Sequence, residues 1–178
     1  MIKFLNSFDN LIFQQIHNLT GKFFVSDFLM IFLAQYLPYL FVLAFIILIF
    51  YKKDWRTRYY FIFLSLLSLL ISRGLAVETI RFFYPKLRPF VMLGLNPLIN
   101  QSSSATFPSG HATLIFTLVT VIFFMEKKWF WYFLLAAVLN AIARVYVGVH
   151  WPTDVIVGAI LGISATFLIQ KFLISRSD

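Results

Sequence analysis

Long apolar segments separated by short polar ones run along most of this chain, but the first segment differs from the rest. Apolar Phe8, Ile12 and Ile16 recur at three- and four-residue spacing, whereas Asp9 and Gln14 fall elsewhere around the same helix. A helix with one apolar and one polar face binds at the boundary between lipid and water. The pattern therefore predicts an amphipathic interfacial helix at the start of the chain.

Residues 23–51 are apolar but contain Gln35 and Pro38, which are poorly suited to the interior of a lipid-exposed helix. Two arrangements fit: one kinked span, or a short helix followed by a span at 37–51. We favour the second. Four more spans are predicted, at residues 59–84, 111–125, 129–147 and 153–174.

Between these spans, residues 84–110 form a long polar stretch that is rich in proline and serine. Structureless loops of this length are usually functional or disordered. We expect a single all-α domain over residues 1–178, a polytopic membrane helix bundle with an amphipathic interfacial start at 1–22 and an active-site loop at 84–110.

The composition supports a membrane protein. The chain is 61% hydrophobic and 12% charged, with a mean hydropathy of +0.86, whereas about a quarter of the residues in soluble domains are charged. The absence of cysteine excludes disulfides and cysteine-based metal or redox sites. The polar residues near the amino terminus do not resemble the continuous apolar core of a cleaved signal peptide.

The net charge of +8 could indicate a nucleic-acid partner, but the chain has no soluble basic domain to bind one. The positive residues cluster in the loops at 52–58 and 127–128 and in a tail containing Lys171 and Arg176. By the positive-inside rule these segments are cytoplasmic. Residues 84–110 and 148–152 then lie at the opposite, outer face.

Three groups of polar residues should meet at that outer face. His111 and His150 are 39 residues apart, but one helix descends and the next returns between them, so they finish at the same membrane level. The groups are Arg81, Lys86 and Arg88; Ser109, Gly110 and His111; and Arg144, His150 and Asp154.

The first two groups, together with Arg144, have the residue types that bind an anion. Ser109 is expected to cap a helix whose free amides face outward, and Gly110 permits close approach to that backbone. Arg81, Arg88 and Arg144 add planar, permanently charged donors that match phosphate oxygens.

The third group suits nucleophilic or basic histidine chemistry. Asp154 follows His150 by one helical turn, and Pro152 between them fits the first turn of a helix. A carboxylate at that spacing can hold an imidazole in one tautomer. Taken singly, the features also fit a capping turn, snorkelling arginines and a structural His-Asp pair, but their convergence on one membrane face favours a site.

The segments "RFFYPKLRP" (81–89), "PSGH" (108–111) and "ARVYVGVHWPTD" (143–154) resemble the three signature motifs of the type 2 phosphatidic acid phosphatase superfamily, which is related to vanadium haloperoxidases. The spacing matches in all three motifs. Arg81 stands where the family has lysine, and Ala143 replaces the serine before Arg144. Neither departure removes a catalytic histidine or the aspartate, so we expect an active enzyme.

The resemblance implies a role for each motif residue. His150 would attack phosphorus and form a phosphohistidine, Asp154 would orient it, and His111 would protonate the leaving group. No metal or other cofactor is expected. The phosphoryl oxygens would be bound by Arg81, Arg88, Ser109, Gly110 and Arg144.

Two further charges, Arg73 and Glu78, lie in the outer half of the span that ends near Arg81. Glu78 is three residues from Arg81, which predicts an ion pair. Glu78 is expected either to brace the phosphate site from behind or to serve packing. His17, on the first helix, is assigned no role.

The opening of the chain and "TFPSGHAT" (106–113) most resemble compact bacterial undecaprenyl-diphosphatases. The resemblance implies a lipid phosphate substrate, a multi-pass location in the bacterial cytoplasmic membrane and an active site on the outer side. Lipid A 1-phosphatases and phosphatidylglycerophosphate or phosphatidate phosphatases share the motifs. The sequence is also compatible with a lipid-to-lipid phosphotransferase and with a non-enzymatic membrane protein or transporter.

Overall fold

The computed structural model describes residues 2–175, and every element within that range is helical. Arg176, part of the predicted cytoplasmic tail, lies outside the described residues. In chain order the elements are α1 (Ile2–His17), α2 (Phe24–Gln35), α3 (Leu37–Tyr51), α4 (Trp55–Leu69), the π-helical η1 (Leu70–Ala76), α5 (Val77–Phe83), α6 (Pro89–Leu93), α7 (Gly110–Met125), α8 (Lys127–Tyr146) and α9 (Pro152–Ile174).

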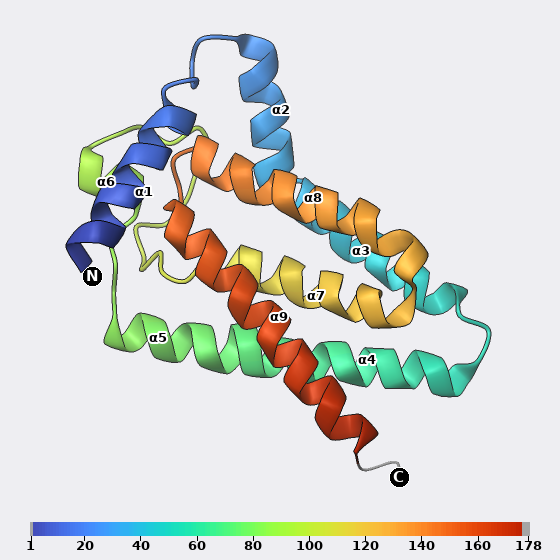
Figure 1. Cartoon of the computed structure of the whole chain (residues 1–178). Coiled ribbons are helices and arrows are strands. Elements are labelled where there is room, and N and C mark those ends of the chain that lie inside the picture. Colours follow the sequence, from blue (N-terminus) through green and yellow to red (C-terminus); the bar gives the residue numbers. More distant parts are fainter. Residues whose placement is uncertain (1, 176–178) are drawn as a thin grey trace.

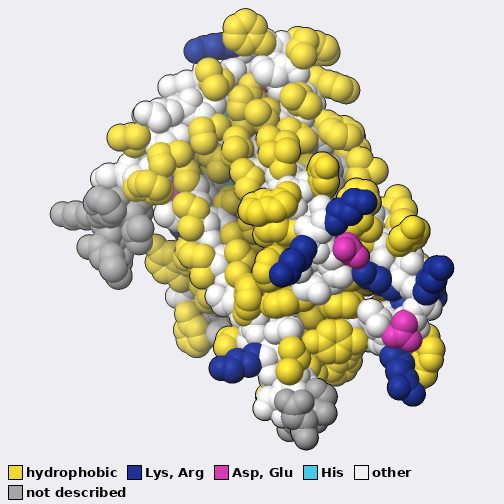
Figure 2. Space-filling model, turned by 45° about the vertical axis from the view of Figure 1, so that its right-hand side comes forward, with side chains coloured by type: hydrophobic (Ala, Val, Ile, Leu, Met, Phe, Trp, Pro, Cys, Tyr) yellow, Lys and Arg dark blue, Asp and Glu magenta, His cyan; other side chains and the backbone are white. Residues whose placement is uncertain are grey.

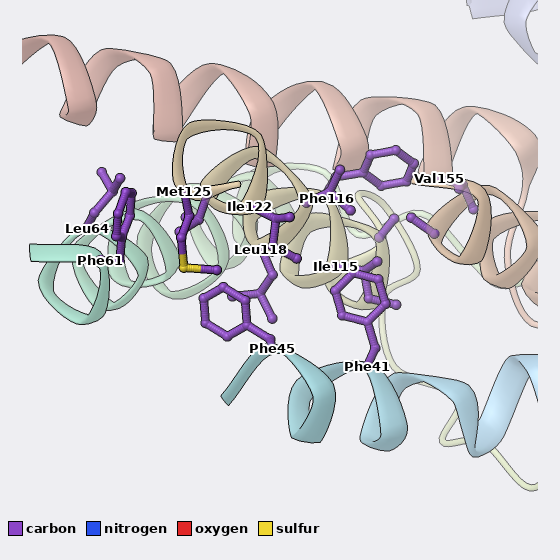
Figure 3. Close-up of a cluster of buried hydrophobic side chains, with 14 of the residues drawn as sticks. Phe41, Phe45, Phe61, Leu64, Ile115, Phe116, Leu118, Ile122, Met125 and Val155 are labelled. Atoms are coloured by element: carbon purple, nitrogen blue, oxygen red, sulfur yellow. The ribbon is translucent and has the colours of Figure 1, made fainter. Parts of the chain in front are cut away.

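Helix α7 forms the centre of the bundle, with α8 on one side and the continuous α4–η1–α5 rod on the other (Figure 1). Its residues are apolar almost all round, which is the pattern of a fully buried helix. Phe41 and Phe45 from α3 and Leu64 from α4 pack with Ile115 and Ile122 of α7 in one hydrophobic cluster (Figure 3).

Two glycines let α9 approach α7 closely. A Cβ added at Gly162 would lie 2.5 Å from the carbonyl oxygen of Thr113, and one added at Gly158 would lie 2.6 Å from that of Ser109. Small residues four apart allow helix backbones to meet in this way. The contact at Ser109 fixes the start of α7 against α9.

Within the described residues, three helical segments are long and apolar enough to cross a membrane: Trp55–Phe83, Lys127–Tyr146 and Pro152–Ile174. Helices α2 and α3 are bent by 48° relative to each other at Tyr36, and they count as a fourth span if this bend is a break within one span. The segment 23–51 is divided into two helices, α2 and α3, which are apolar and long enough for a span only when taken together. With the 16-residue apolar α7, this is a multi-pass membrane architecture.

Exposed charged side chains of the α3–α4 and α7–α8 loops gather at one end of the bundle. Figure 2 shows Lys, Arg and acidic side chains over the end that carries the α3–α4 and α7–α8 loops. Lys52 of the first loop forms an ion pair of 2.8 Å with Glu126 of the second. The loop 84–110 and the turn 148–152 lie at the opposite end (Figure 1).

Helix α1 packs across that opposite end. Phe13 is buried, with its ring centroid 5.1 Å from that of Trp151. His17 Nδ1 lies 2.8 Å from the Tyr146 carbonyl oxygen, so this histidine ties α1 to the end of α8. The helical pattern places Asp9 on the polar face, yet Asp9 is only 2% exposed. Its carboxylate faces the protein because the amide and hydroxyl of Thr153, in the first turn of α9, donate to it there.

Candidate active site

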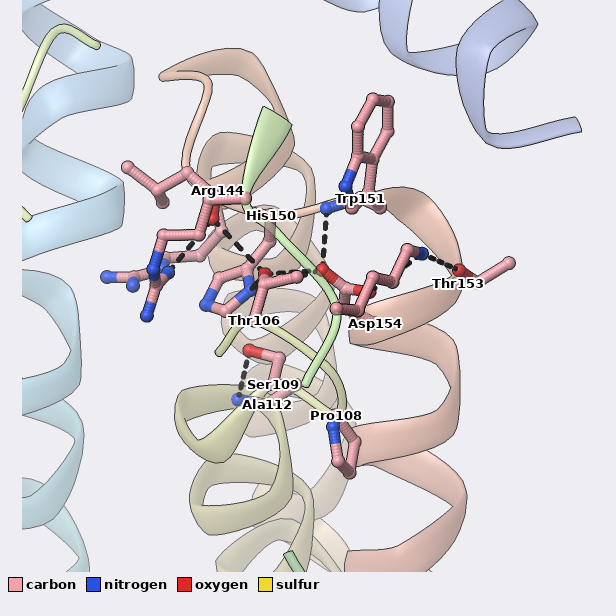
Figure 4. A network of polar contacts seen from close by, with 12 residues as sticks. Thr106, Pro108, Ser109, Ala112, Arg144, His150, Trp151, Thr153 and Asp154 are labelled. Carbon is pink, nitrogen blue, oxygen red and sulfur yellow. Dashed lines mark hydrogen bonds and ion pairs between the residues drawn. The ribbon is translucent and has the colours of Figure 1, made fainter. Parts of the chain in front are cut away.

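A buried hydroxyl stands between the proposed nucleophile and its carboxylate. Thr106 Oγ1 donates to Asp154 Oδ2 at 2.6 Å and lies 2.8 Å from His150 Nδ1 (Figure 4). The direct separation between His150 Nδ1 and Asp154 Oδ2 is 3.5 Å. The sequence predicted that Asp154 orients His150, and in the structure Thr106 mediates that contact.

The direction of these hydrogen bonds selects one tautomer of His150. Because the Thr106 hydroxyl gives its proton to the carboxylate, its oxygen accepts from His150 Nδ1–H. The Nε2 lone pair is then free to attack an electrophile. Burial lowers the pKa of His150 to about 4, an effect that the neighbouring Asp154 opposes only in part. The ring is therefore neutral, and nucleophilic, at neutral pH.

The Asp154 carboxylate is held from several directions. Its Oδ2 also accepts from the Trp151 amide at 2.9 Å, and its Oδ1 lies 3.2 Å from Lys86 Nζ. Lys86 in turn pairs with Asp9 of α1 at 2.7 Å. Asp9 accepts from both the amide and the hydroxyl of Thr153, in the first turn of α9. Helix α1 thus contributes directly to this network.

The site residues Thr106, Lys86 and Asp9 were not assigned roles from the sequence. Thr106 belongs to the "TFPSGHAT" stretch, and Lys86 was grouped with the outer-face cations. Asp9 carried a weaker signal, as an acid inside a largely apolar helix. None of these contacts could be assigned without the fold, because they join residues up to 144 positions apart.

Ser109 caps α7 as predicted: its Oγ accepts from the Ala112 amide at 3.4 Å. Its own amide donates to the Asp154 carbonyl oxygen at 2.9 Å, which ties the helix start to α9. Gly110 is buried, and His111 beside it is exposed. An accessible imidazole next to a helix amino terminus can exchange a proton with a bound anion.

Two of the motif arginines are buried beside His150. Arg88 donates to the Ser104 and Val149 carbonyl oxygens at 3.1 and 3.0 Å. Arg144 donates to Gln101 Oε1 at 3.2 Å. Burial lowers the pKa of Arg88 to about 10, so it remains a cation at neutral pH.

Arg81 lies on the other side of the α7 start. It donates to the Pro108 carbonyl oxygen at 3.1 Å and pairs with Glu78 at 3.3 Å, which confirms the predicted ion pair. Within the described part of the chain, the Nε groups of Arg81 and Arg144 are buried donors without a hydrogen-bond partner. Unpaired buried donors of this kind are costly unless an anion binds them.

Ala143, where the family motif has serine, is fully buried in a small apolar cluster with Ala34 and Tyr146. Across residues 2–175 no group of three or more His, Cys, Asp or Glu side chains could hold a metal ion.

A family comparison agrees with this geometry: residues 62–176 match the model of the PAP2 superfamily. The chain belongs to the PAP2 superfamily. An undecaprenyl-diphosphatase of Sulfolobus acidocaldarius is 34% identical to it over 88% of this chain and 71% of the relative. The undecaprenyl-diphosphatase BcrC of Bacillus subtilis is 27% identical over 90% of this chain and 82% of the relative.

Solved PAP2 phosphatases share the fold. The crystal structure of Aquifex aeolicus LpxE superposes with a TM-score of 0.74 at 27% identity, covering 90% of this chain and 93% of that one. A transmembrane PAP2-type phosphatidylglycerolphosphate phosphatase from Bacillus subtilis gives 0.69 at 26% identity, with coverages of 94% and 85%. The protein is accordingly a membrane lipid phosphatase of PAP2 type, a phosphoric ester hydrolase.

Proposed function

We propose that this PAP2 phosphatase removes the terminal phosphate of a lipid diphosphate, with undecaprenyl diphosphate as substrate and undecaprenyl phosphate as product. The observation that carries the chemistry is the His150–Thr106–Asp154 arrangement, which leaves Nε2 of a neutral imidazole free. The choice of lipid is supported by the names of the Sulfolobus and Bacillus relatives.

The proposed reaction has two steps. His150 Nε2 forms a bond to the terminal phosphorus while the bond from phosphorus to the bridging oxygen breaks. Exposed His111, protonated when the anionic substrate binds beside it, donates a proton to that oxygen. Water then attacks the phosphohistidine, His111 takes a proton from it, and the N–P bond breaks to release inorganic phosphate. Asp154 stabilises the imidazolium through Thr106.

Charge on the phosphoryl oxygens would be stabilised by the three motif arginines and the start of α7. A bound anion would accept hydrogen bonds from the unpaired Nε groups of Arg81 and Arg144. A phosphoryl oxygen would take the place of Gln101 Oε1 on Arg144. Ser109 and Gly110 form the start of the helix, and the ion pair with Glu78 fixes the position of the Arg81 guanidinium.

We also propose a bacterial cytoplasmic membrane location with the site on the outer side. The support is the clustering of basic residues at the end of the bundle opposite the site (Figure 2). Ser103→Cys, in the exposed part of the loop, should react in intact cells with a membrane-impermeant thiol reagent. Labelling only by permeant reagents would reverse the orientation.

A lipid monophosphate is the second candidate substrate, favoured by the similarity to lipid A and phosphatidylglycerophosphate phosphatases. The test is an assay of purified protein in one detergent against undecaprenyl diphosphate, phosphatidylglycerophosphate, phosphatidate and lipid A. The kcat/KM values rank these four substrates. A higher kcat/KM for any monophosphate would contradict the proposed substrate.

The roles of the two histidines are tested by the same assay. His150→Ala should be inactive on every substrate. His111→Ala should impair phosphatidate far more than undecaprenyl diphosphate, because an alkoxide is a much poorer leaving group than a phosphate. An equal fall on both substrates would show that His111 holds phosphate instead of donating a proton.

A further inference from the structure

Arg73 lies on η1, the π-helical segment between α4 and α5 in the continuous rod that these three elements form. Its guanidinium packs against Gly110: a Cβ added there would lie 2.7 Å from Arg73 Cζ and 3.0 Å from Nη2. Gly110 is the first residue of α7, directly before His111. Short π-helical insertions within α-helices often occur at functional sites. Arg73 is therefore a further cation at the phosphate end of α7.

The charge around Arg73 is not balanced within the protein. Glu78 Oε1 accepts from Arg73 Nη1 at 2.5 Å and from Arg81 Nη1 at 3.3 Å, so one carboxylate serves two guanidinium groups. The Arg73 side chain is 37% exposed. Among the described residues, Nε and Nη2 of Arg73 donate to no protein acceptor, and these atoms face Gly110. The arrangement leaves donors available to an anion beside the helix start.

The position of Arg73 fits one part of a diphosphate substrate. His150 lies at the α8–α9 turn, whereas η1 lies on the side of α7 away from α8 (Figure 1). In the proposed reaction His150 attacks the terminal phosphorus, and the bridging oxygen leaves toward His111. Because the attacking and leaving atoms are roughly in line, the lipid-proximal phosphate lies on the side of the phosphorus opposite His150. Arg73 meets Gly110 on the side of α7 away from the α8–α9 turn, which is where this phosphate is expected.

We propose that Arg73 binds the lipid-proximal phosphate of a diphosphate substrate and thereby sets a preference for lipid diphosphates over monophosphates. This rests on the proposed function. When the terminal phosphorus–oxygen bond breaks, the bonding electrons pass to the oxygen of the proximal phosphate. A guanidinium beside that phosphate stabilises the added charge by paired hydrogen bonds. A monophosphate places no phosphate there and gains nothing from Arg73.

The test compares two ligands that differ by one phosphate. Farnesyl methylenediphosphonate and farnesyl phosphonate are not hydrolysed at the attacked linkage, so their inhibition constants report binding even if turnover is weak. Arg73→Gln should raise the inhibition constant of the diphosphonate by about 10- to 100-fold, the loss of a charge-assisted hydrogen bond or two, and barely change that of the monophosphonate. Equal changes for both, or none, would overturn the proposal.

Enzyme turnover provides a second, independent test of the role of Arg73. With farnesyl diphosphate and farnesyl phosphate as substrates, Arg73→Gln should lower kcat/KM on the diphosphate selectively, and Arg73→Lys, which keeps the charge but loses the planar fork, should fall between. Arg56→Gln, an exposed arginine at the other end of the same rod, is the matched control. In Arg73→Gln, Glu78 keeps its ion pair with Arg81, so the substitution leaves no carboxylate without a cationic partner.

The outcome is separable from that of the proposed function. A wild-type enzyme that prefers monophosphates would contradict the proposed substrate, whatever Arg73 does. An unchanged ratio of inhibition constants would contradict the role of Arg73 even in an efficient diphosphatase. If Arg73→Gln does not fold, the ratio measured with Arg73→Lys decides: no selective weakening of the diphosphonate overturns the proposal.

Discussion

The Thr106 hydroxyl oxygen lies 2.8 Å from His150 Nδ1, and both side chains are buried. The same hydroxyl donates to Asp154, so the carboxylate acts on the imidazole through a threonine. The consequence is that the orientation of His150, the proposed nucleophile, depends on a residue from the loop 84–110 as well as on the α8–α9 turn.

Replacing Thr106 should therefore impair the chemical step. Thr106→Val keeps the shape but removes the hydroxyl, and we expect kcat to fall by about 10- to 100-fold, from the loss of a hydrogen bond to a charged group. Thr106→Ser should retain most activity. Steady-state kinetics on undecaprenyl diphosphate check this, with KM reported separately. If serine and valine variants are equally impaired, packing and not the hydroxyl is what matters.

The protonation state of His150 can be observed directly. Because burial lowers its pKa to about 4, its imidazole should stay neutral from pH 8 down to about pH 5, with Nδ1 carrying the proton. Nitrogen NMR of protein with labelled histidine, three in all, gives both the titration and the tautomer. His150→Gln assigns the signal. A midpoint at or above the ordinary value of about 6.5 would contradict this expectation.

Lys86 and Asp9 should be energetically coupled. Lys86→Met leaves the buried Asp9 and Asp154 without their shared counter-charge, at a cost on the order of 3 kcal/mol, whereas Asp9→Asn leaves Lys86 paired with Asp154 and should cost less. The double variant should lose less thermal stability than the sum of the two, measured by unfolding in one detergent. Strict additivity would show that the ion pair contributes nothing. Lys86→Met should also lower kcat, because Lys86 contacts Asp154.

The close contact between α7 and α9 should not tolerate a methyl group. Gly162→Ala would place a Cβ 2.5 Å from the Thr113 carbonyl oxygen, so the helices must separate, at about 1–3 kcal/mol. Gly74→Ala is the matched control, since its Cβ would meet Leu70 at an ordinary 3.7 Å. Apparent melting temperatures of the two variants make the comparison. Equal stability would mean that the contact can relax freely.

Activity should survive chelation, because arginines and helix amides supply the positive charge at the phosphate. Purified enzyme assayed with and without EDTA, and again after adding Mg²⁺, gives the answer. Loss of phosphate release in EDTA that Mg²⁺ restores would show that a metal ion takes part in the reaction.

The helices could be predicted from the sequence because their causes are local. Apolar runs long enough to cross a membrane predicted α8 and α9 to within a few residues, and Gln35 and Pro38 indicated the break near Tyr36. Ser109 was predicted to cap α7 because capping depends on neighbours in sequence. The ion pair between Glu78 and Arg81 was predicted for the same reason: it joins residues three apart on one helix.

The assembly around Asp154 was decided only by the tertiary structure. Thr106 and Lys86 of the loop 84–110 contact it, and Asp9 of α1 joins the network through Lys86 and Thr153. No local sequence pattern records which donor will meet which acceptor. The position of Asp9 shows this most clearly. Helical periodicity placed it on a polar face, but whether a polar face meets water or a buried network depends on what packs against it. Arg73 likewise gained its place beside Gly110 only when η1 packed on α7.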